Sequence, residues 1–417
     1  MNAGSVYVIG AGLSGLSAAV ALAKRGARVR LIEGTGQAGG RCRSYVDPVL
    51  DQVIDNGNHL ILSGNYATLD YLRTIGAADK LAGPDTASFD FMDVRSDARW
   101  TIRANDGPLA WWVFAPSRRV PGSSLSEYLA LAKLLLATPE KRIDEVIVCK
   151  GPVWEKLLHP LLLAALNTEP ETASAGLAAA IIRETLAKGG RAYRPRIASP
   201  TLSAAFIDPA LAYLGIRGAS VHFGSRLREI VTANGRVTSL KLADDDIAIL
   251  DADRVVLATP SWVTAELLPN IAVPTAFRAI VNAHFAVAPP PGATLMTGVI
   301  GGTAEWVFAF HDRLSVTISG ADAILDQDRE TLADTLWRDV AAVHRLGPEL
   351  PPWQIVKERR ATFASTPEQA KKRAGAETAW QNLFLAGDWT DTGLPATIEG
   401  SVRSGQRAAA LALPTTV

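Results

Sequence analysis

The chain has 417 residues, in which 42 lysines and arginines balance 42 aspartates and glutamates. This length exceeds one typical domain, and the balanced charge gives no electrostatic reason to expect nucleic acid as a partner. The two cysteines, Cys42 and Cys149, are too few for a disulfide framework and suit a reducing cytoplasm, and we predict no metal site. The sequence contains no run of roughly 18 apolar residues, and its first apolar run leads into a glycine motif. We therefore expect neither a membrane span nor a signal peptide.

The N-terminal segment predicts a strand, a tight turn, a helix and a second strand within about thirty residues. An apolar run over 6–9 is followed by a helical segment over 16–24 and by an apolar run over 29–32. The turn before the helix holds a Gly-x-Gly-x-x-Gly motif made of Gly10, Gly12 and Gly15. In this context the motif predicts a dinucleotide-binding site.

Each residue of this unit has its own expected role. Gly10 permits the turn, Gly12 lets a pyrophosphate approach the backbone, and Gly15 lets helix and strand pack closely. The phosphates would bind free N–H groups at the positive end of the helix. Glu33, at the end of the second strand, would accept hydrogen bonds from ribose hydroxyls.

The loop after Glu33 indicates which dinucleotide binds. It contains Gly39-Gly40-Arg41, and an Asn-Gly-Asn stretch follows at 56–58. This resembles the Gly-Gly-Arg element of the flavin amine oxidases and phytoene-type desaturases, where it lies along the FAD pyrophosphate and ribityl chain. Arg41 would offset phosphate charge, while the two glycines would let backbone N–H groups come near. The alternative is a plain basic surface loop.

Three predicted elements follow in the next part of the chain. Residues 60–82 indicate a helix that ends at Gly76. Between 86 and 120, short alternating runs rich in Phe and Trp indicate strands of a different layer. Residues 124–137 predict a helix whose leucines cover much of its circumference. We expect that helix to be buried, with contact to lipid as the alternative.

The segment 153–170 places Trp154 and four leucines on one helical face, and Pro160 should kink or restart this helix. Asn167 is a polar group at the end of the apolar element. Two interpretations stay open at this point. The segment is either a core helix with an Asn cap or the wall of an apolar pocket with a polar point inside it.

The second half of the chain contributes first to the predicted dinucleotide-binding unit and then to a different part of the fold. Residues 219–230 and 253–260 resemble the family strands beside FAD, and a hairpin between them turns at Asn234-Gly235. Residues 270–370 predict strands at 279–285, 306–310 and 315–319, then an amphipathic helix over 330–345.

The C-terminus resembles the second FAD signature of the same family. An apolar strand ends in Gly387-Asp388, and a helix should start near Thr397. In the family the Asp holds the ribityl and pyrophosphate region, and the positive helix end faces the flavin pyrimidine edge. The residues predicted to bind FAD are Gly10, Gly12, Leu13, Ser14, Gly15, Glu33, Gly34, Gly39, Gly40, Arg41, Asn56, Gly57, Asn58, Leu227, Thr259, Gly387, Asp388, Thr397 and Ile398.

These elements predict an α/β fold with two domains, like that of the amine oxidases and desaturases. A discontinuous Rossmann-like FAD-binding domain would comprise 1–85, 205–265 and 376–417. A mixed α+β substrate-binding domain would comprise 86–204 and 266–375.

Proteins with this fold catalyse many different reactions, so the reaction has to be inferred from the middle of the chain. It is aliphatic and aromatic, and it lacks an evident acid cluster for a cationic amine. Two sequence motifs resemble those of the squalene-associated FAD enzymes, the hydroxysqualene dehydroxylases of bacterial hopanoid biosynthesis. They are Leu166-Asn167-Thr168 and the C-terminal sequence Leu-Pro-Ala-Thr-Ile-Glu-Gly. The resemblance covers essentially the whole chain. It implies reductive removal of an allylic hydroxyl from hydroxysqualene, giving squalene, with hydride from reduced FAD.

Two readings from other classes stay open. A carotenoid-type desaturase or an amine oxidase would use the flavin in the opposite direction. A non-enzymatic FAD-bearing partner of a prenyl synthase complex would bind FAD without turnover. Squalene or hydroxysqualene synthase-type enzymes are the functional partners that the resemblance implies.

A dehydroxylase needs a polar group at the substrate hydroxyl, and the candidates are Asn167, His159, Tyr193 and the neighbouring Asn58 and His59. Asn167 can position a hydroxyl but is no acid, whereas His159, Tyr193 and His59 could supply a proton. His59 has a rival role, because the 55–59 segment often supports the flavin in this family.

The expected location is the cytoplasm, with peripheral contact to the inner face of the cell membrane because the substrate is insoluble. The apolar segments near 125–136 and 157–166 are candidate entrance walls. Introducing charges at Leu134 and Leu135 is the test that the sequence suggests, and it should reduce sedimentation of the protein with liposomes.

Overall fold

The computed structural model describes residues 4–413 and contains a parallel five-stranded sheet of order β10-β2-β1-β14-β20. Its strands are β1 (Ser5–Ile9), β2 (Arg28–Ile32), β10 (Ser220–His222), β14 (Arg254–Leu257) and β20 (Leu383–Leu385). The central strands are apolar and buried on both faces, as parallel strands covered by helices require. The predicted glycine-motif unit is therefore confirmed as β1, helix α1 (Leu13–Lys24) and β2.

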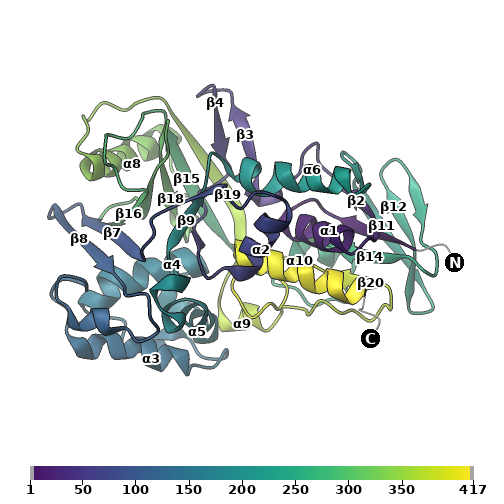
Figure 1. Ribbon diagram of the computed structural model, residues 1–417, viewed down its shortest axis with the longest axis horizontal. Coiled ribbons are helices and arrows are strands. Elements are labelled where there is room, and N and C mark those ends of the chain that lie inside the picture. The colour runs from purple at the N-terminus through teal and green to yellow at the C-terminus, as the bar shows by residue number, and fades with distance from the viewer. Residues whose placement is uncertain (1–3, 414–417) are drawn as a thin grey trace.

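The first and last helices of the chain lie side by side (Figure 1). Helix α10 (Ile398–Ala412) approaches α1 so closely that a Cβ atom on Gly405 would lie 2.2 Å from the carbonyl oxygen of Ser14. A larger residue at Gly405 would therefore push the two helices apart. Helix α10 begins after Thr397, which accepts a hydrogen bond from the N–H of Gly400 as its N-cap, and this confirms the predicted start.

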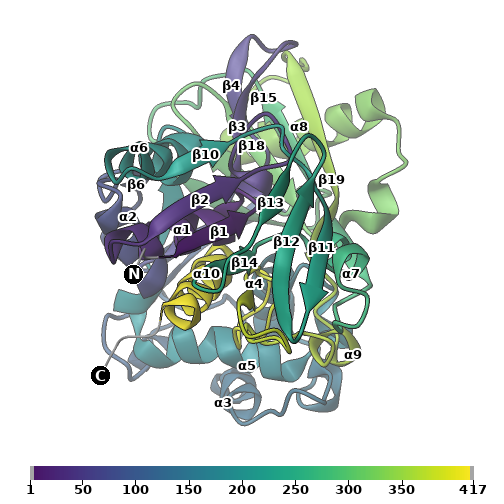
Figure 2. The ribbon, with the colours of Figure 1, turned by 90° about the vertical axis from the view of Figure 1, so that its right-hand side faces the viewer.

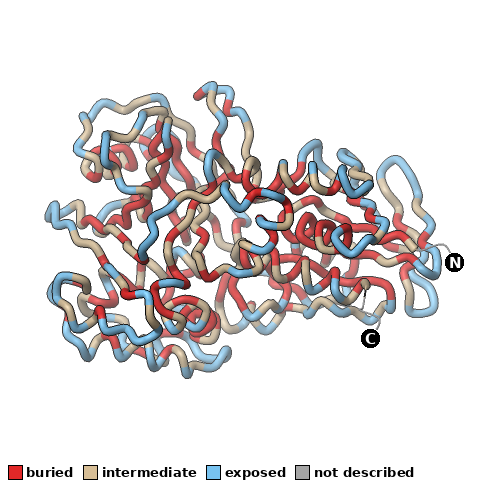
Figure 3. The backbone as a smooth tube through the Cα atoms, viewed as in Figure 1, coloured by how far each residue is buried: buried red, intermediate tan, exposed pale blue. Residues whose placement is uncertain are grey.

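A mixed seven-stranded sheet of order β19-β15-β18-β17-β16-β7-β8 forms the second layer system. Its strands are β7 (Ser88–Asp93), β8 (Ala98–Arg103), β15 (Phe277–Phe285), β16 (Met296–Ile300), β17 (Trp306–Ala309), β18 (Leu314–Ile318) and β19 (Trp353–Phe363). Helix α8 (Arg329–His344) buries its apolar face against this sheet, as the amphipathic pattern predicts. Buried residues follow both sheets and the helices packed on them (Figure 3).

The smaller elements connect these two layer systems. The β11–β12 hairpin turns at Asn234 and Gly235, both with positive φ, as predicted, and it lies with β13 at the end of the molecule seen in Figure 2. The remaining strands are β3 (Ser44–Asp47), β4 (Gln52–Asp55), β5 (Ile61–Leu62), β6 (Leu81–Ala82), β9 (Pro195–Ala198), β11 (Leu227–Ala233), β12 (Arg236–Leu242) and β13 (Asp246–Ala248). The remaining helices are α2 (Tyr66–Thr74), α3 (Leu129–Leu135), α4 (His159–Leu166), α5 (Ala175–Glu184), α6 (Asp208–Ile216), α7 (Ser261–Leu267) and α9 (Pro367–Ala370).

Two sequence-based expectations need correction. The helix expected over 60–82 is shortened to α2, because 61–62 and 81–82 pair with β9 as short strands. Within 86–120, the Trp111–Phe114 stretch forms a 3-10 turn instead of a strand. In both places strand pairing and tertiary packing, which cannot be read from the local sequence, outweighed the local sequence pattern.

The helix predicted over 124–137 is a 3-10 turn (Leu125–Tyr128) followed by α3, and its burial is only partial. Leu134 is fully buried, whereas Leu129 and Leu136 are 61% and 86% exposed. The expectation of a buried helix is therefore wrong for much of its circumference. Pro160 lies in the first turn of α4, which restarts after a π-helical turn (Trp154–Leu158), as the sequence suggested.

Candidate active site

A cavity of about 1350 Å³ runs from the glycine motif to the seven-stranded sheet and α4. At one end its walls are backbone and polar groups of the β1–α1 turn and the Gly387-Asp388 stretch. At the other end the walls are apolar, formed by side chains that include Trp112, Leu131, Leu157, Leu158, Leu161, Leu162, Trp306 and Phe308. One continuous space therefore joins a nucleotide cradle to an aliphatic and aromatic chamber.

The glycine motif leaves room where a pyrophosphate would lie. A Cβ atom on Gly12 would meet no protein atom within 4 Å, so the backbone there faces open space at the start of α1. Gly15 instead lies behind the turn, where a Cβ would be 1.8 Å from the carbonyl oxygen of Gly10. Of the predicted FAD-binding residues, all except Gly15 line the cavity. The residues present thus fit an FAD molecule, with Gly15 acting through packing.

The second glycine turn lies against the first. Gly39 donates its N–H to the carbonyl oxygen of Ala11 at 2.8 Å, and both Gly39 and Gly40 have positive φ. Glu33 fixes the same region, because its carboxylate accepts from the N–H of Ala11 at 2.7 Å and from the N–H of Thr35 at 2.9 Å. Glu33 lines the cavity and its oxygens retain capacity for ribose hydroxyls. Its second role, tying the two loops together, was not foreseen from the sequence.

The two predicted FAD signatures meet in an ion pair. Arg41 Nη2 lies 2.7 Å from Asp388 Oδ1, and the same guanidinium also donates to the carbonyl oxygen of Ala361. The Asp388 side chain is almost fully buried, whereas that of Arg41 is partly open to the cavity. Arg41 therefore keeps an exposed cationic edge that a phosphate can bind.

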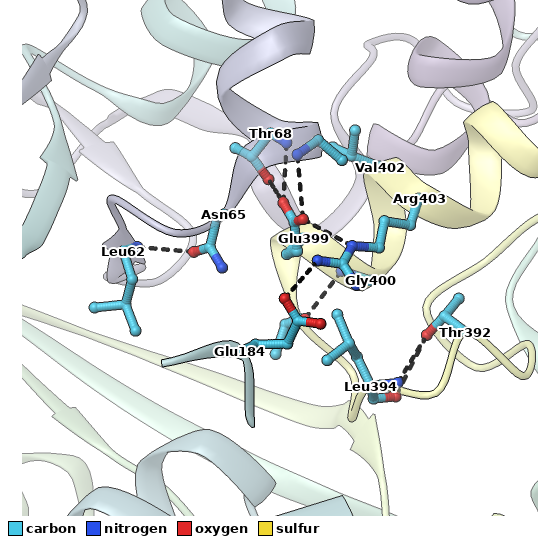
Figure 4. A network of polar contacts seen from close by, with 12 residues as sticks. Leu62, Asn65, Thr68, Glu184, Thr392, Leu394, Glu399, Gly400, Val402 and Arg403 are labelled. Carbon is cyan, nitrogen blue, oxygen red and sulfur yellow. Dashed lines mark hydrogen bonds and ion pairs between the residues drawn. The ribbon is translucent and has the colours of Figure 1, made fainter. Parts of the chain in front are cut away.

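A network of polar contacts anchors the start of α10 beside the cavity (Figure 4). Glu399 is buried and accepts hydrogen bonds from the N–H and hydroxyl of Thr68, at 2.9 and 2.7 Å. Arg403 donates to Glu399 at 2.8 Å and to Glu184 of α5 at 3.1 Å. This network joins three helices and holds the positive end of α10 toward the cavity. The spacing of Glu399 and Arg403, four residues apart on one helix, is the signal that could have revealed it.

The polar centre of the cavity lies between the Asn56–Asn58 stretch and the seven-stranded sheet. Asn58 donates to the hydroxyl of Thr317 at 3.0 Å, and that hydroxyl donates to Asn282 at 2.8 Å. The Oδ1 atom of Asn58 is buried and has no protein partner among the described residues. A buried acceptor without a partner costs free energy, so this atom marks a place for a donor from a bound molecule.

Asn167 is held by the protein through both polar atoms of its side chain. It caps α4 with φ of 46°, donates to the hydroxyl of Thr362 at 2.9 Å, and accepts from the N–H of Gly320 at 2.7 Å. It also lines the cavity with the α4 leucines. Both interpretations of this segment are therefore correct in part. Asn167 caps the helix, and α4 forms an apolar wall of the cavity.

The structure does not bring His159 into the cavity. Its Nε2 lies 2.8 Å from Glu169 Oε1 on the outer side of α4, and its ring contacts Trp154 edge-on. Periodicity placed it on the right helix, but the packing of α4 turns it away from the cavity wall.

His59 and Tyr193 do line the cavity, but neither is suited to release a proton near neutral pH. Burial and the charge of Arg41 lower the pKa of His59 to about 4, so its imidazole is neutral. Burial raises the pKa of Tyr193, which packs against Phe89. Tyr193 is thus an aromatic wall residue with a weakly acidic hydroxyl.

Comparison with known proteins agrees with this fold. The family model for flavin-containing amine oxidoreductases matches residues 13–413. The chain superposes on a crystal structure of cyclohexylamine oxidase from Brevibacterium oxydans with a TM-score of 0.71, at 14% identity and 98% coverage of both chains. The chain therefore belongs to the flavin-containing amine oxidoreductase family, and the predictions of its fold and of an FAD cofactor are confirmed.

Within that family the sequence is much closer to one group. It is 54% identical to a hydroxysqualene dehydroxylase of Rhodopseudomonas palustris over 98% of both chains. It is 51% identical to a hydroxysqualene dehydroxylase of Sinorhizobium fredii over 99% of both. The chain is accordingly a member of the hydroxysqualene dehydroxylase group, as the sequence resemblance indicated, and the desaturase and amine oxidase readings are not favoured.

Proposed function

We propose that this protein removes the hydroxyl group of hydroxysqualene reductively, giving squalene for hopanoid-type isoprenoid synthesis. The observation that carries the proposal is the single cavity that joins an FAD cradle to a chamber lined by leucines and aromatic rings. When bound, reduced FAD supplies a hydride to the substrate carbon. The apolar chamber binds the long hydrocarbon by burial, which contributes about 25 cal/mol per Å².

The protein's contribution is to orient the substrate, exclude water and stabilise positive charge. Loss of an allylic hydroxyl leaves a cation, which the electron-rich faces of Trp112, Tyr193, Trp306 and Phe308 can stabilise. The α4 leucines keep bulk water away from this cation, which water would otherwise capture. We assign Asn167 to positioning α4 against β15 and β19, and His59 to supporting the flavin next to Arg41.

The three segments 1–85, 205–265 and 376–417 supply every strand of the five-stranded sheet, and 86–204 and 266–375 supply every strand of the seven-stranded sheet. This supports the proposed division into an FAD-binding and a substrate-binding domain. The cavity has lining residues from both sets of segments, as expected of a ligand pocket at a domain interface.

Peripheral contact with the membrane is part of the proposal. Among the described residues, no helix is long and apolar enough to span a bilayer. The 109–136 segment nevertheless exposes several large apolar side chains, namely Leu109, Trp111, Phe114, Leu125, Leu129 and Leu136. Two other residues of this segment, Trp112 and Leu131, line the cavity. A lipid-dissolved substrate could therefore pass from a membrane surface to the cavity past the 109–136 segment. Synthase-type enzymes that supply hydroxysqualene are the expected functional partners.

Product analysis tests the function directly. The purified protein is reduced chemically without oxygen, mixed with hydroxysqualene, and extracted for mass spectrometry. Squalene formed in proportion to the reduced flavin is the expected result. Bound FAD without squalene would overturn the proposal, and carotenoid precursors and amines would then be tested by flavin bleaching. Loss of turnover with every substrate would favour a non-enzymatic partner role.

A further inference from the structure

The proposed dehydroxylation requires a proton as well as a hydride. The C–O bond breaks, the oxygen takes up one proton and leaves as water, and the carbon receives the hydride while the reduced flavin is oxidised. The proton has to reach the hydroxyl without admitting bulk water, because water would capture the cation. A side-chain route between the protein surface and the cavity meets this requirement.

None of the candidate side chains singled out in the sequence provides that route, and the amide of Asn58 has no acidic proton to give. Asn167 has no acidic proton, and His159 lies outside the cavity wall. His59 is neutral because its pKa is lowered to about 4, and Tyr193 is a weaker acid than an exposed tyrosine. The proton donor must therefore lie elsewhere.

Glu305 and Ser319 have the required arrangement. Glu305 directly precedes β17 and Ser319 directly follows β18, so these neighbouring antiparallel strands bring the two residues together. The N–H of Ser319 donates to Glu305 Oε2 at 2.8 Å, which holds the Glu305 carboxyl group next to Ser319. Ser319 is 5% exposed and lines the cavity beside Thr317, whereas Glu305 lies just behind the wall.

An acidic group at the protein surface acts on Glu305. Glu169, which is exposed, acts electrostatically on Glu305 and pairs with His159 at 2.8 Å. Glu171 lies beside this pair. One side-chain nitrogen or oxygen atom from each of His159, Glu169 and Glu171 lies within 4.8 Å of the other two. Glu305 is itself only partly buried, so solvent can return a proton to it after each turnover.

We infer that Glu305 stores the proton consumed in the reaction and delivers it through the Ser319 hydroxyl to the departing hydroxyl of the substrate. In this relay the Glu305 hydroxyl donates to Ser319 Oγ while the Ser319 hydroxyl donates to the substrate oxygen. Glu305 acts through Ser319 and does not touch the substrate. The inference rests on the proposed function and adds the source of its proton.

The electrostatic surroundings support this role. Burial raises the pKa of Glu305 to about 8, the hydrogen bond from the Ser319 N–H opposes the rise, and the charge of Glu169 adds to it. The neighbouring charged side chain beyond Ser319, Asp322, is paired with Arg278 at 3.8 Å. Glu305 is therefore protonated at neutral pH, as a proton donor must be, and would lose its proton as the pH rises through about 8.

Infrared spectroscopy of the substrate-free protein tests the protonation state independently of turnover. We expect the carbonyl band of a protonated carboxylic acid to disappear between about pH 6 and about pH 10 in the native protein and to be missing in Glu305→Gln. The exposed Glu349→Gln serves as the matched control and should keep the band. Persistence of the same titrating band in Glu305→Gln would overturn the inference without bearing on squalene formation.

Single-turnover kinetics test the relay itself. Glu305→Gln keeps an oxygen acceptor for the N–H of Ser319, so we expect FAD content to be retained while flavin oxidation by hydroxysqualene slows by about 10²–10⁴-fold. We expect the native rate to decline above about pH 8, and the rate of Glu305→Gln to lack this decline. Ser319→Ala, which keeps the N–H, should slow the reaction similarly, and Glu305→Asp should restore part of the rate.

Native-like rates and pH profiles in both Glu305→Gln and Ser319→Ala would show that the proton comes from another group. If the native protein formed no squalene at all, the proposed function would fail instead. The two failures are therefore distinguishable.

Discussion

Arg41 and Asp388, 347 residues apart in the chain, form an ion pair of 2.7 Å on the wall of the cavity. The pair joins the loop after β2 to the end of β20, so each predicted FAD signature fixes the other. The buried carboxylate of Asp388 depends on Arg41 for its charge partner, while Arg41 also presents its guanidinium to the cavity.

Removing the cation of this pair should weaken both folding and cofactor binding. We expect Arg41→Met to lower the free energy of unfolding by about 1–3 kcal/mol, because Asp388 is left without its partner. FAD affinity should fall at least tenfold through loss of the phosphate contact. Thermal melting of the FAD-free protein and flavin titration measure these effects. The control Arg73→Met breaks an exposed pair with Asp70 and should change neither quantity by much. Unchanged FAD affinity in Arg41→Met would remove Arg41 from the cofactor site.

Asn167 should prove structural. Asn167→Leu loses hydrogen bonds to Thr362 and Gly320 and places a bulky residue at positive φ, so we expect a loss of about 2–4 kcal/mol in the free energy of unfolding. Chemical denaturation measures this loss, and the exposed Asn270→Leu provides the control. A variant with native stability but no turnover would instead place Asn167 in contact with the substrate.

Membrane contact should depend on the exposed leucines of the 109–136 segment. Leu134 is fully buried, so introducing a charge there would disrupt the core and would not be an informative test. The double variant Leu129→Asp/Leu136→Asp should instead reduce binding to phosphatidylcholine and phosphatidylglycerol vesicles by about tenfold or more. Sedimentation with vesicles measures it. Leu250→Asp, exposed on the hairpin sheet side of the molecule, is the control. Equal sedimentation of the double variant and the native protein would remove this segment from any membrane contact.

Stability should fall as the pH is lowered below about 6.5, partly through His284. Burial and the charge of Arg313 lower the pKa of His284 to about 3, so the folded protein holds it neutral. Between about 3 and about 6.5 the unfolded chain binds a proton that the folded chain does not, and this favours unfolding by up to about 1.4 kcal/mol per pH unit.

Melting temperature measured from pH 8 down to about pH 5 shows the effect. His284→Gln should have a shallower decline than the native protein, whereas the exposed His222→Gln should retain the native slope. An unchanged slope in His284→Gln would mean that other groups account for the acid sensitivity. His59 and His344, with pKa values lowered to about 4, contribute in the same direction.

The sequence by itself determined the cofactor-binding unit, because its features are local. The Gly10–Gly15 motif, the turn at Asn234-Gly235 and the N-cap at Thr397 each depend on the backbone preferences of a few adjacent residues. Family resemblance then supplied FAD and the reaction, and the comparisons agree with both.

The tertiary structure alone decided which side chains face the cavity. It paired Arg41 with Asp388, turned His159 outward to Glu169, and brought Glu305 to Ser319 through adjacent strands. At the end of α3 it buried Leu134 and exposed Leu136, although both are leucines two residues apart. Periodicity specifies the faces of an element, but the packing of distant segments determines what each face meets.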